Sequence, residues 1–272
     1  MSSQGSRESR RRAIEQAKAA EARRKRRLRL AIAGSVVAVA GLAAGITVAT
    51  AGGSPAGSVA SSASGSPTGS ASGSAGSAGT TLGSLSTLGT LRPAPAGGPT
   101  GPEGVPIPGG TPLAGTASSA TGQAVDGIGC NTSEQTLFHI HAHLTIFVNG
   151  VARQVPAAIG IPGAVPQQTP AGPFIGSGTC FYWLHTHAAD GIVHIESPVQ
   201  RTYTLGDFFD EWGQPLGPDQ VGPAKGHVTV IYNGRVFEQN PRDVPLTAHA
   251  QIQLEVGTPL VAPESITWPN GL

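Results

Sequence analysis

HIHAHLTIFVNG, residues 139–150, alternates histidine with apolar residues before it reaches an Asn-Gly pair. Successive side chains of a β-strand point to opposite faces, so the three histidines share one face of a predicted strand. The apolar residues between them then face a core. Asn149-Gly150 predicts a tight hairpin turn after this strand, because both residues tolerate a positive φ.

Two further segments repeat the alternation, Leu184–His187 and Val193–Glu196, with a short loop between them. They predict an antiparallel hairpin over residues 183–196. A loop of two or of four residues puts the polar side chains of both strands on one face, where opposed Cβ atoms are about 5 Å apart. A three-residue loop would move one of the two sets to the opposite face.

The length of this loop decides which histidines lie opposite each other. A two-residue turn at Asp190-Gly191 places His187 opposite His194, whereas a four-residue loop over 188–191 places His185 there. Either register gives an HxH strand beside a third histidine. That arrangement offers a metal three ligands and leaves one coordination position open.

Neutral imidazole is a suitable ligand for zinc, copper, iron and nickel, so histidines gathered on strand faces predict a metal site. We expect copper or zinc, held in one site or two. Glu196 is expected to ligate the metal, to orient a ring, or to pair with the histidine opposite. His227 and His249 are weaker candidates, and Asp190 is expected to serve the turn. The predicted ligands are His139, His141, His143, His185, His187 and His194.

Other segments of the same region predict short strands and one helix. Val228–Tyr232 leads into a second Asn-Gly pair, and Ala250–Val256 alternates apolar and polar residues as a final strand. Thr204–Asp207 predicts the start of a short helix that ends at Gly213. The predicted fold class is mainly β (α+β) with one short helix, arranged as a β-grasp-like unit or a small sandwich.

The N-terminal part has a different composition. Residues 1–29 carry eleven of the seventeen Lys and Arg residues, and residues 30–51 carry no charge. Twenty-two uncharged residues make about 33 Å of helix, enough to cross a bilayer core. The sequence therefore predicts a basic cytoplasmic segment at 1–29 and a transmembrane signal-anchor at 30–51, with later residues outside the cell. The alternative is a signal peptide cleaved after Ala51.

Residues 52–125 are rich in Gly, Ser, Ala, Thr and Pro and contain no aromatic residue. This composition predicts a disordered linker, because it offers too little apolar area to offset the entropy of ordering the chain. Residues 126–272 contain every aromatic residue and every histidine, and we predict one globular domain there. Five basic and twelve acidic residues give this domain a formal charge of −7, which disfavours nucleic acid and favours cations.

Cys130 and Cys180 are the only cysteines of the chain, and both lie in the part predicted to be outside the cell. An even pair in such a compartment favours a disulfide over a thiolate metal ligand. Each cysteine comes shortly before a histidine segment. A bridge would therefore hold those two segments together.

Three sequence blocks also carry a family resemblance: CNTSEQTLFHIHAHLTIFVNG at 130–150, CFYWLHTHAADGIVHIESP at 180–198 and YTLGDFFDEWG at 203–213. They resemble the shared blocks of a largely uncharacterised family of secreted or membrane-anchored bacterial and archaeal proteins. The resemblance covers about residues 128–257. It implies an extracytoplasmic domain in which the histidine blocks belong together, and it implies no activity. The family often has Asp after LHTH, where this chain has Ala188.

Three classes of function follow. The first is a membrane-tethered metal-binding module that captures, delivers or senses copper or zinc, with the membrane bound through residues 30–51. The second is a cell-envelope interaction domain whose histidines are structural or respond to pH. The third is a metalloenzyme in which a site of three histidines holds a metal that activates water or dioxygen. Glu196 would then serve as a base, but the sequence identifies no second acid, nucleophile or substrate pocket, so an enzyme is the least favoured class.

Overall fold

We describe residues 80–272 from a computed structural model of the chain. The predicted cytoplasmic segment, the predicted transmembrane segment and residues 52–79 lie outside the described residues. Between residues 80 and 272, no helix is long and apolar enough to cross a membrane.

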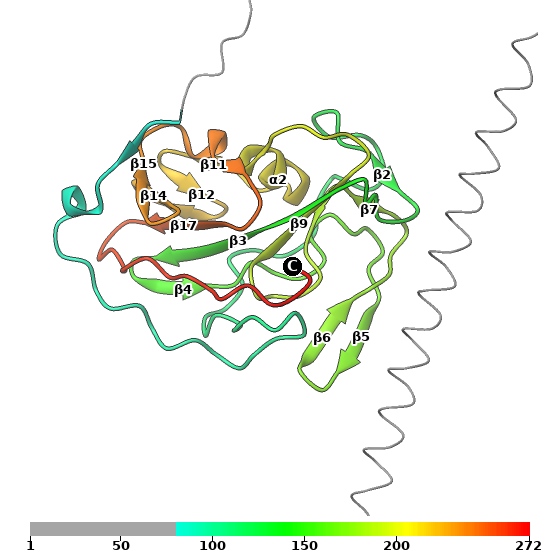
Figure 1. Cartoon of the computed structure of the whole chain (residues 1–272), viewed down its shortest axis with the longest axis horizontal. Helices are drawn as coiled ribbons and strands as arrows, with labels where there is room; N and C mark the ends of the chain where they lie inside the picture. Colours follow the sequence, from blue (N-terminus) through cyan, green and yellow to red (C-terminus); the bar gives the residue numbers. More distant parts are fainter. Residues whose placement is uncertain (1–79) are drawn as a thin grey trace, which may run out of the picture. The chain divides into compact units, whose positions relative to one another are not determined.

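A mixed sheet of eight strands forms the centre of this part of the chain (Figure 1). Seven of them follow the order β1-β15-β14-β17-β3-β9-β8, and β4 pairs with β3. β17 and β3 are parallel, whereas the other neighbours are antiparallel. The strands are β1 Leu82–Gly83, β3 Phe138–Val148, β4 Val151–Arg153, β8 Leu184–His185, β9 Ile192–Ser197, β14 Val228–Tyr232, β15 Arg235–Phe237 and β17 Ala250–Val256.

Four short sheets and three helical segments complete the described chain. The antiparallel pairs are β2 Cys130–Asn131 with β7 Phe181–Tyr182, β5 Pro166–Thr169 with β6 Gly172–Ile175, and β10 Tyr203–Thr204 with β16 Pro245–Leu246. A three-stranded sheet contains β11 Leu216–Gly217, β12 Gln220–Val221 and β13 Ala224–Lys225. The helical segments are α2 Leu205–Trp212 and the 3-10 turns η1 Leu85–Leu88 and η2 Pro241–Asp243.

The described chain is mainly β with one α-helix, as the sequence predicts. In the central strands β9-β3-β17-β14, the second, first, fourth and third strands in chain order lie side by side. The first and fourth are parallel, and α2 connects the second to the third. The described strands therefore form a multi-strand mixed sheet with one helix between its second and third central strands.

Both Asn-Gly turns form where the sequence predicts them. Asn149 and Gly150 have φ angles of 51° and 73°, and Asn233 and Gly234 have 50° and 74°. These left-handed conformations close two-residue turns between β3 and β4 and between β14 and β15. The first turn fixes the end of β3, the strand that carries HIHAH.

The helix packs its apolar stripe against the sheet. Thr204 accepts a hydrogen bond from the backbone of Asp207, whose carboxylate accepts one from the backbone of Thr204, and this capping box starts α2. Gly213 ends it in the left-handed conformation with φ of 70°. The apolar residues of β3, β8 and β9 face this helix in one core cluster, which includes Leu144, Leu184, Val193, Ile195, Phe208, Phe209 and Trp212.

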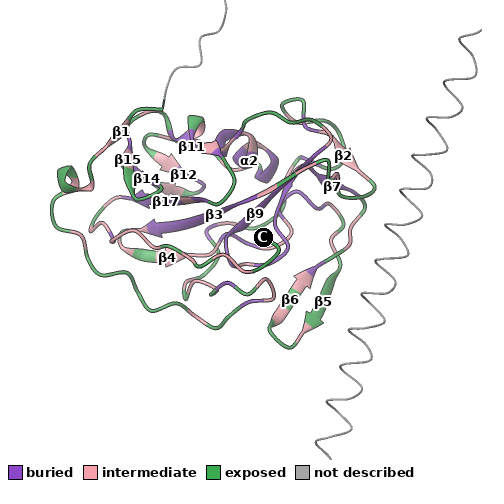
Figure 2. Cartoon of the chain, in the orientation of Figure 1, coloured by how far each residue is buried: buried purple, intermediate pink, exposed green. Residues whose placement is uncertain are grey.

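The prediction of a disordered linker over 52–125 is wrong for residues 80–125. β1 pairs with β15, and Leu113 and Ala120 belong to the main core cluster. The Leu113 amide also donates to the carbonyl of Gln154, 3.0 Å away. Buried and half-buried positions recur along this segment in Figure 2. A few aliphatic side chains and backbone pairing order the segment on an existing sheet, although its composition could not build a core by itself.

The outer face of β17 is covered rather than exposed. Its polar residues Gln253 and Glu255 are buried, because residues 261–264 lie against them. The Glu264 amide donates to Gln253 (2.8 Å) and the Val261 amide donates to Glu255 (3.1 Å). The alternation of β17 is as predicted, but the polar face is paired with the C-terminal chain instead of water.

The predicted disulfide between Cys130 and Cys180 is confirmed, with Cα atoms 5.5 Å apart. It joins β2 to the residue that precedes β7, and Cys130 pairs with Tyr182 across that small sheet. The bridge therefore links the chain just before β3 to the chain just before β8. Two of the three histidine-bearing strands, β3 and β8, therefore follow this junction in the chain.

Candidate metal centre

Three neighbouring strands bring the histidines together. His141 of β3 and His185 of β8 both lie opposite His194 of β9, one on each side. The His185–His194 register is the one that a four-residue loop predicts, and strand pairing ends at His185. The histidines occupy the face opposite the apolar core because they alternate with core residues such as Ala142 and Ile195.

His185 and His187 form a buried pair. The Nδ1–H group of His185 donates to the carbonyl of Tyr182 (2.8 Å), and that of His187 donates to the carbonyl of Ile175. A carbonyl can only accept, so both neutral rings carry their proton on Nδ1 and leave a lone pair on Nε2. The two Nε2 atoms are 3.2 Å apart. Two lone pairs therefore face each other with no proton between them.

Burial keeps this pair neutral. Desolvation lowers the pKa of His185 well below its usual value, and the neighbouring His194 and His187 lower it further. Desolvation and His194 likewise lower the pKa of His187. Neutral, deprotonated Nε2 atoms are the form in which histidine binds a metal.

His139 and His141 form a second pair on β3. Their Nε2 atoms are 3.0 Å apart, and their ring centroids are 4.6 Å apart. His141 is buried, and desolvation together with His194 and His139 lowers its pKa to about 3. The His139 side chain is 37% exposed, so this pair has the more direct contact with solvent.

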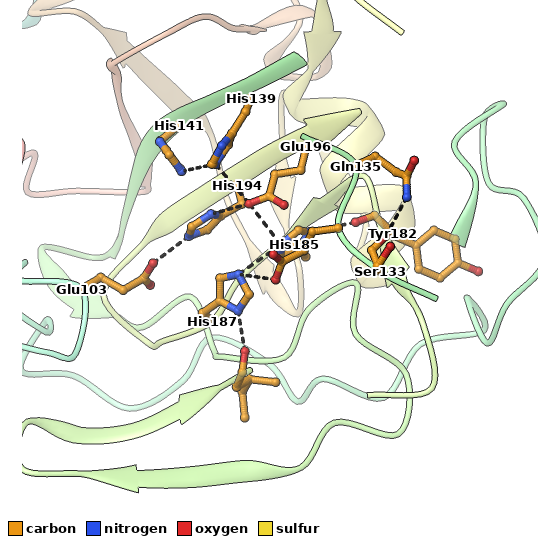
Figure 3. Close-up of polar contacts among 12 residues, drawn as sticks. Glu103, Ser133, Gln135, His139, His141, Tyr182, His185, His187, His194 and Glu196 are labelled. Carbon is orange, nitrogen blue, oxygen red and sulfur yellow. Dashed lines mark hydrogen bonds and ion pairs between the residues drawn. The ribbon is translucent and has the colours of Figure 1, made fainter. Parts of the chain in front are cut away.

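Glu196 lies between the two pairs. Its Oε1 atom is 3.1 Å from His139 Nε2 and 4.0 Å from His185 Nε2, and its Oε2 atom is buried with no hydrogen-bond partner. Burial alone would raise the pKa of this carboxyl, but hydrogen bonds from His139 and His194 hold it well below its usual range. Figure 3 shows the His139–His141 and His185–His187 rings on opposite sides of Glu196 and His194.

His194 occupies the middle of the cluster as a cation. Its Nδ1 is 3.3 Å from Glu196 Oε1, and its Nε2 is 2.6 Å from Glu103 Oε1. Burial opposes the charge, yet the hydrogen bonds to Glu103 and Glu196 raise the pKa of His194 to about 9. Without a metal, the imidazolium of His194 therefore supplies the positive charge between two buried carboxylates.

Five of the six predicted histidine ligands, together with Glu196, thus fall into two overlapping groups that could hold a metal ion. His139, His141, His194 and Glu196 form one, and His185, His187, His194 and Glu196 form the other. In each group the four ligand atoms lie within 4.8 Å of one another. A shared cluster of this kind agrees with the histidine alternation in the sequence.

The other three histidines lie outside both groups. His143 hydrogen-bonds through Nε2 to the Asp190 carbonyl (3.0 Å), and desolvation lowers its pKa to about 4. The prediction of His143 as a ligand is therefore not met in this arrangement, although it shares the strand face. His249 stacks on Trp268, and neither it nor His227 belongs to a candidate group.

Glu103 is the site residue that sequence reasoning missed. It lies in the segment assigned to the linker, where backbone bonds from Gly98 to Ile107 and from Gly101 to Val105 fold the chain back and bring it to His194. Its side chain is 5% exposed. One available signal was its position as the single acidic residue among 74 otherwise nearly uncharged positions.

Asp190 serves the turn as predicted, and it also lies against the site. Its Oδ1 accepts from the Ile192 amide (3.2 Å), while its Oδ2 is buried with no hydrogen-bond partner. Desolvation and the nearby Glu103 raise its pKa to about 7. Glu134 adds an outer carboxylate, 3.7 Å from His187 Nε2.

Comparisons of the chain with protein-family models, with curated proteins and with solved structures found no match.

Proposed function

We propose that this chain is a membrane-tethered extracytoplasmic module that binds copper or zinc for capture, delivery or sensing. The observation that carries the metal proposal is the His185–His187 pair, with two neutral, inward-facing Nε2 lone pairs 3.2 Å apart. At metal–nitrogen distances of 2.0–2.1 Å, tetrahedral ligands lie about 3.3 Å apart. The spacing of the pair therefore fits two ligands of one ion.

The hydrogen bonds made by the second ring nitrogen of each histidine also support metal ligation. A metal-ligating histidine usually donates its second ring N–H to a carbonyl or carboxylate, which fixes the tautomer and the ring orientation. His185 and His187 both donate to backbone carbonyls in this way. The ligand type suits copper or zinc, and both cysteines are occupied by the disulfide, so thiolate ligation does not contribute.

The location follows from separate features. The uncharged segment 30–51 after a basic flank supports an anchor with the folded part outside the cytoplasm. The Cys130–Cys180 disulfide fits an oxidising compartment. An anchored site at the outer face of a membrane would meet ions before they cross it.

The test is elemental analysis of the full-length chain, exported in oxidised form without a His tag. We expect bound copper or zinc at one or more ions per chain, with a content that falls in His185→Ala/His187→Ala while the circular dichroism spectrum is kept. His227→Ala/His249→Ala is the matched control, because it removes two histidines outside the cluster and should leave the metal content unchanged. Absence of metal after challenge with Cu(II) and with Zn(II) would overturn the proposal and favour the envelope-interaction class.

A further inference from the structure

Resting on the proposed metal function, we infer that the cluster is a dinuclear centre: His139 and His141 hold one ion, His185 and His187 hold a second, and the Glu196 carboxylate bridges them. Three observations support it: the spacing of the ligand atoms, the unpartnered oxygen of Glu196 and the buried carboxyl groups around the cluster.

The spacing of the ligand atoms excludes a single ion bound by all six residues of the two candidate groups. Ligands about 2.1 Å from one ion cannot be more than about 4.2 Å apart. The Nε2 atoms within each histidine pair satisfy this limit at 3.0 and 3.2 Å. Among the described residues, however, no group with ligand atoms within 4.8 Å contains both pairs. The two pairs therefore serve different ions.

Glu196 is placed to serve both ions. In Figure 3 it lies between the two pairs, with His139 on one side and His185 on the other. Oε1 is within 3.1 Å of His139 Nε2, and the buried Oε2 has no hydrogen-bond partner. A buried, unpaired carboxylate oxygen is unfavourable unless a cation or donor meets it. A bridging carboxylate would satisfy both oxygens and fits metals about 3.5–4 Å apart.

The carboxyl groups around the cluster support more than one cation. Glu103, Asp190 and Glu196 bring three carboxyl groups together, and each has one buried oxygen without a partner. The His194 ring lies between Glu103 Oε1, 2.6 Å from Nε2, and Glu196 Oε1, 3.3 Å from Nδ1. The same ring lies 4.5 Å from that of His141 and 4.4 Å from that of His187, so it borders both pairs.

Copper stoichiometry and magnetic coupling test the inference. The oxidised full-length chain is loaded with Cu(II), gel-filtered, and examined by elemental analysis and by electron paramagnetic resonance. We expect two copper ions per chain, with a signal weaker than that of two isolated ions because nearby spins couple. His139→Ala/His141→Ala and His185→Ala/His187→Ala should each retain one copper ion with a full, uncoupled signal.

Two further variants sharpen the test. Glu196→Gln should abolish the magnetic coupling and weaken copper binding at least tenfold. The control variant His227→Ala/His249→Ala should keep both copper ions and their coupling. If His185→Ala/His187→Ala does not fold, the copper content of His139→Ala/His141→Ala tests the dinuclear centre by itself. That variant is expected to fold, because His139 is partly exposed and the pair lies on a long central strand.

The outcomes separate the two proposals. One copper ion in the unaltered chain, lost in both double variants, would overturn the dinuclear centre and leave the metal-binding function standing. Two ions without magnetic coupling would overturn the Glu196 bridge. No copper and no zinc would overturn the proposed function itself.

Discussion

At the scale of single residues, the site contains histidines of opposite character. His141, His143, His185 and His187 are kept neutral by burial, whereas His194 is kept charged by Glu103 and Glu196. Alternation in the sequence places these side chains on one face, so the membership of the cluster could largely be predicted. Their protonation could not, because it depends on depth and on a carboxylate from a distant segment.

The neutral histidines make the metal-free protein sensitive to acid. Their pKa values are lower in the folded chain than in the unfolded chain, so unfolding takes up protons as the pH falls below about 6.5. Each contributes a loss of up to about 2 kcal/mol in the free energy of unfolding between pH 7 and pH 5. Urea denaturation of the full chain in EDTA at both values measures this loss. Burial raises the pKa of Asp190 and of Glu255 to about 7, so these two carboxyls act in the opposite direction over the same pH range, and the histidine part is isolated by comparison with a histidine variant.

His143 offers a variant for the same measurement. Its pKa of about 4 lies well below the measured range, and it does not belong to either candidate metal group. His143→Gln should therefore reduce the loss between pH 7 and pH 5 by about 2 kcal/mol. Its metal content should stay that of the unaltered chain.

The contribution of His194 to stability has the opposite pH dependence and is lost at high pH. Its folded-state pKa of about 9 exceeds the unfolded value, so its contribution to stability is fully present below about 6.5 and is lost as the pH rises through 9. Glu103→Gln should weaken this loss, because one of the two carboxylates that hold the charge is removed. Denaturation of metal-free protein at pH 7 and pH 9.5 compares the two chains. An unchanged pH profile would show that Glu103 does not hold the His194 charge.

At the scale of elements, short sequence motifs were sufficient to predict the turns and the start of the helix. The Asn-Gly turns and the capped helix formed as predicted, because turn and cap chemistry act over two to four residues. The register of β8 against β9 was left between two alternatives. Contacts of residues 186–191 with β6 and with the loop before it fix this register, for example the hydrogen bond from the Ile175 amide to the His187 carbonyl (2.9 Å). A local sequence pattern cannot predict such contacts.

The helix cap gives a prediction at this scale. Thr204→Ala removes the hydroxyl that accepts from the Asp207 amide and should lower the free energy of unfolding by about 1 kcal/mol. Thr204→Ser keeps the hydroxyl and should differ little from the unaltered chain. Urea denaturation of the three chains at pH 7 makes the comparison. Equal effects of Ala and Ser would show that the methyl group, rather than the cap, matters.

At the scale of the whole molecule, composition misplaced the domain boundary. Residues 80–125 have no aromatic residue and almost no charge, yet they complete the core with Leu113 and the site with Glu103. Composition tests whether a segment can fold alone, and this one folds only on a sheet built by later residues. The predicted disulfide and the mainly β class did not depend on that boundary and stand.

Leu113 tests the corrected boundary. Leu113→Ala should lower the free energy of unfolding by about 2 kcal/mol, because it removes buried methyl groups from the main core cluster. Leu137→Ala is the matched control: Leu137 is 86% exposed, and its truncation should change stability by less than about 0.5 kcal/mol. Similar small effects of both substitutions would show that residues 80–125 do not contribute to the core, as the linker prediction holds.

The parallel pairing of β3 with β17 has a consequence for timing. Ala142 lies beside Ala250, so the central pair of the sheet closes only after more than a hundred intervening residues have been made. Pairings this distant in the chain make folding slow compared with local hairpins. β3 therefore gains its neighbour on one side, β17, much later in the chain than its neighbour on the other side, β9. Unlike a zinc finger, which an ion organises from a few neighbouring residues, this site is built on strands that pair with one another through their own backbone hydrogen bonds.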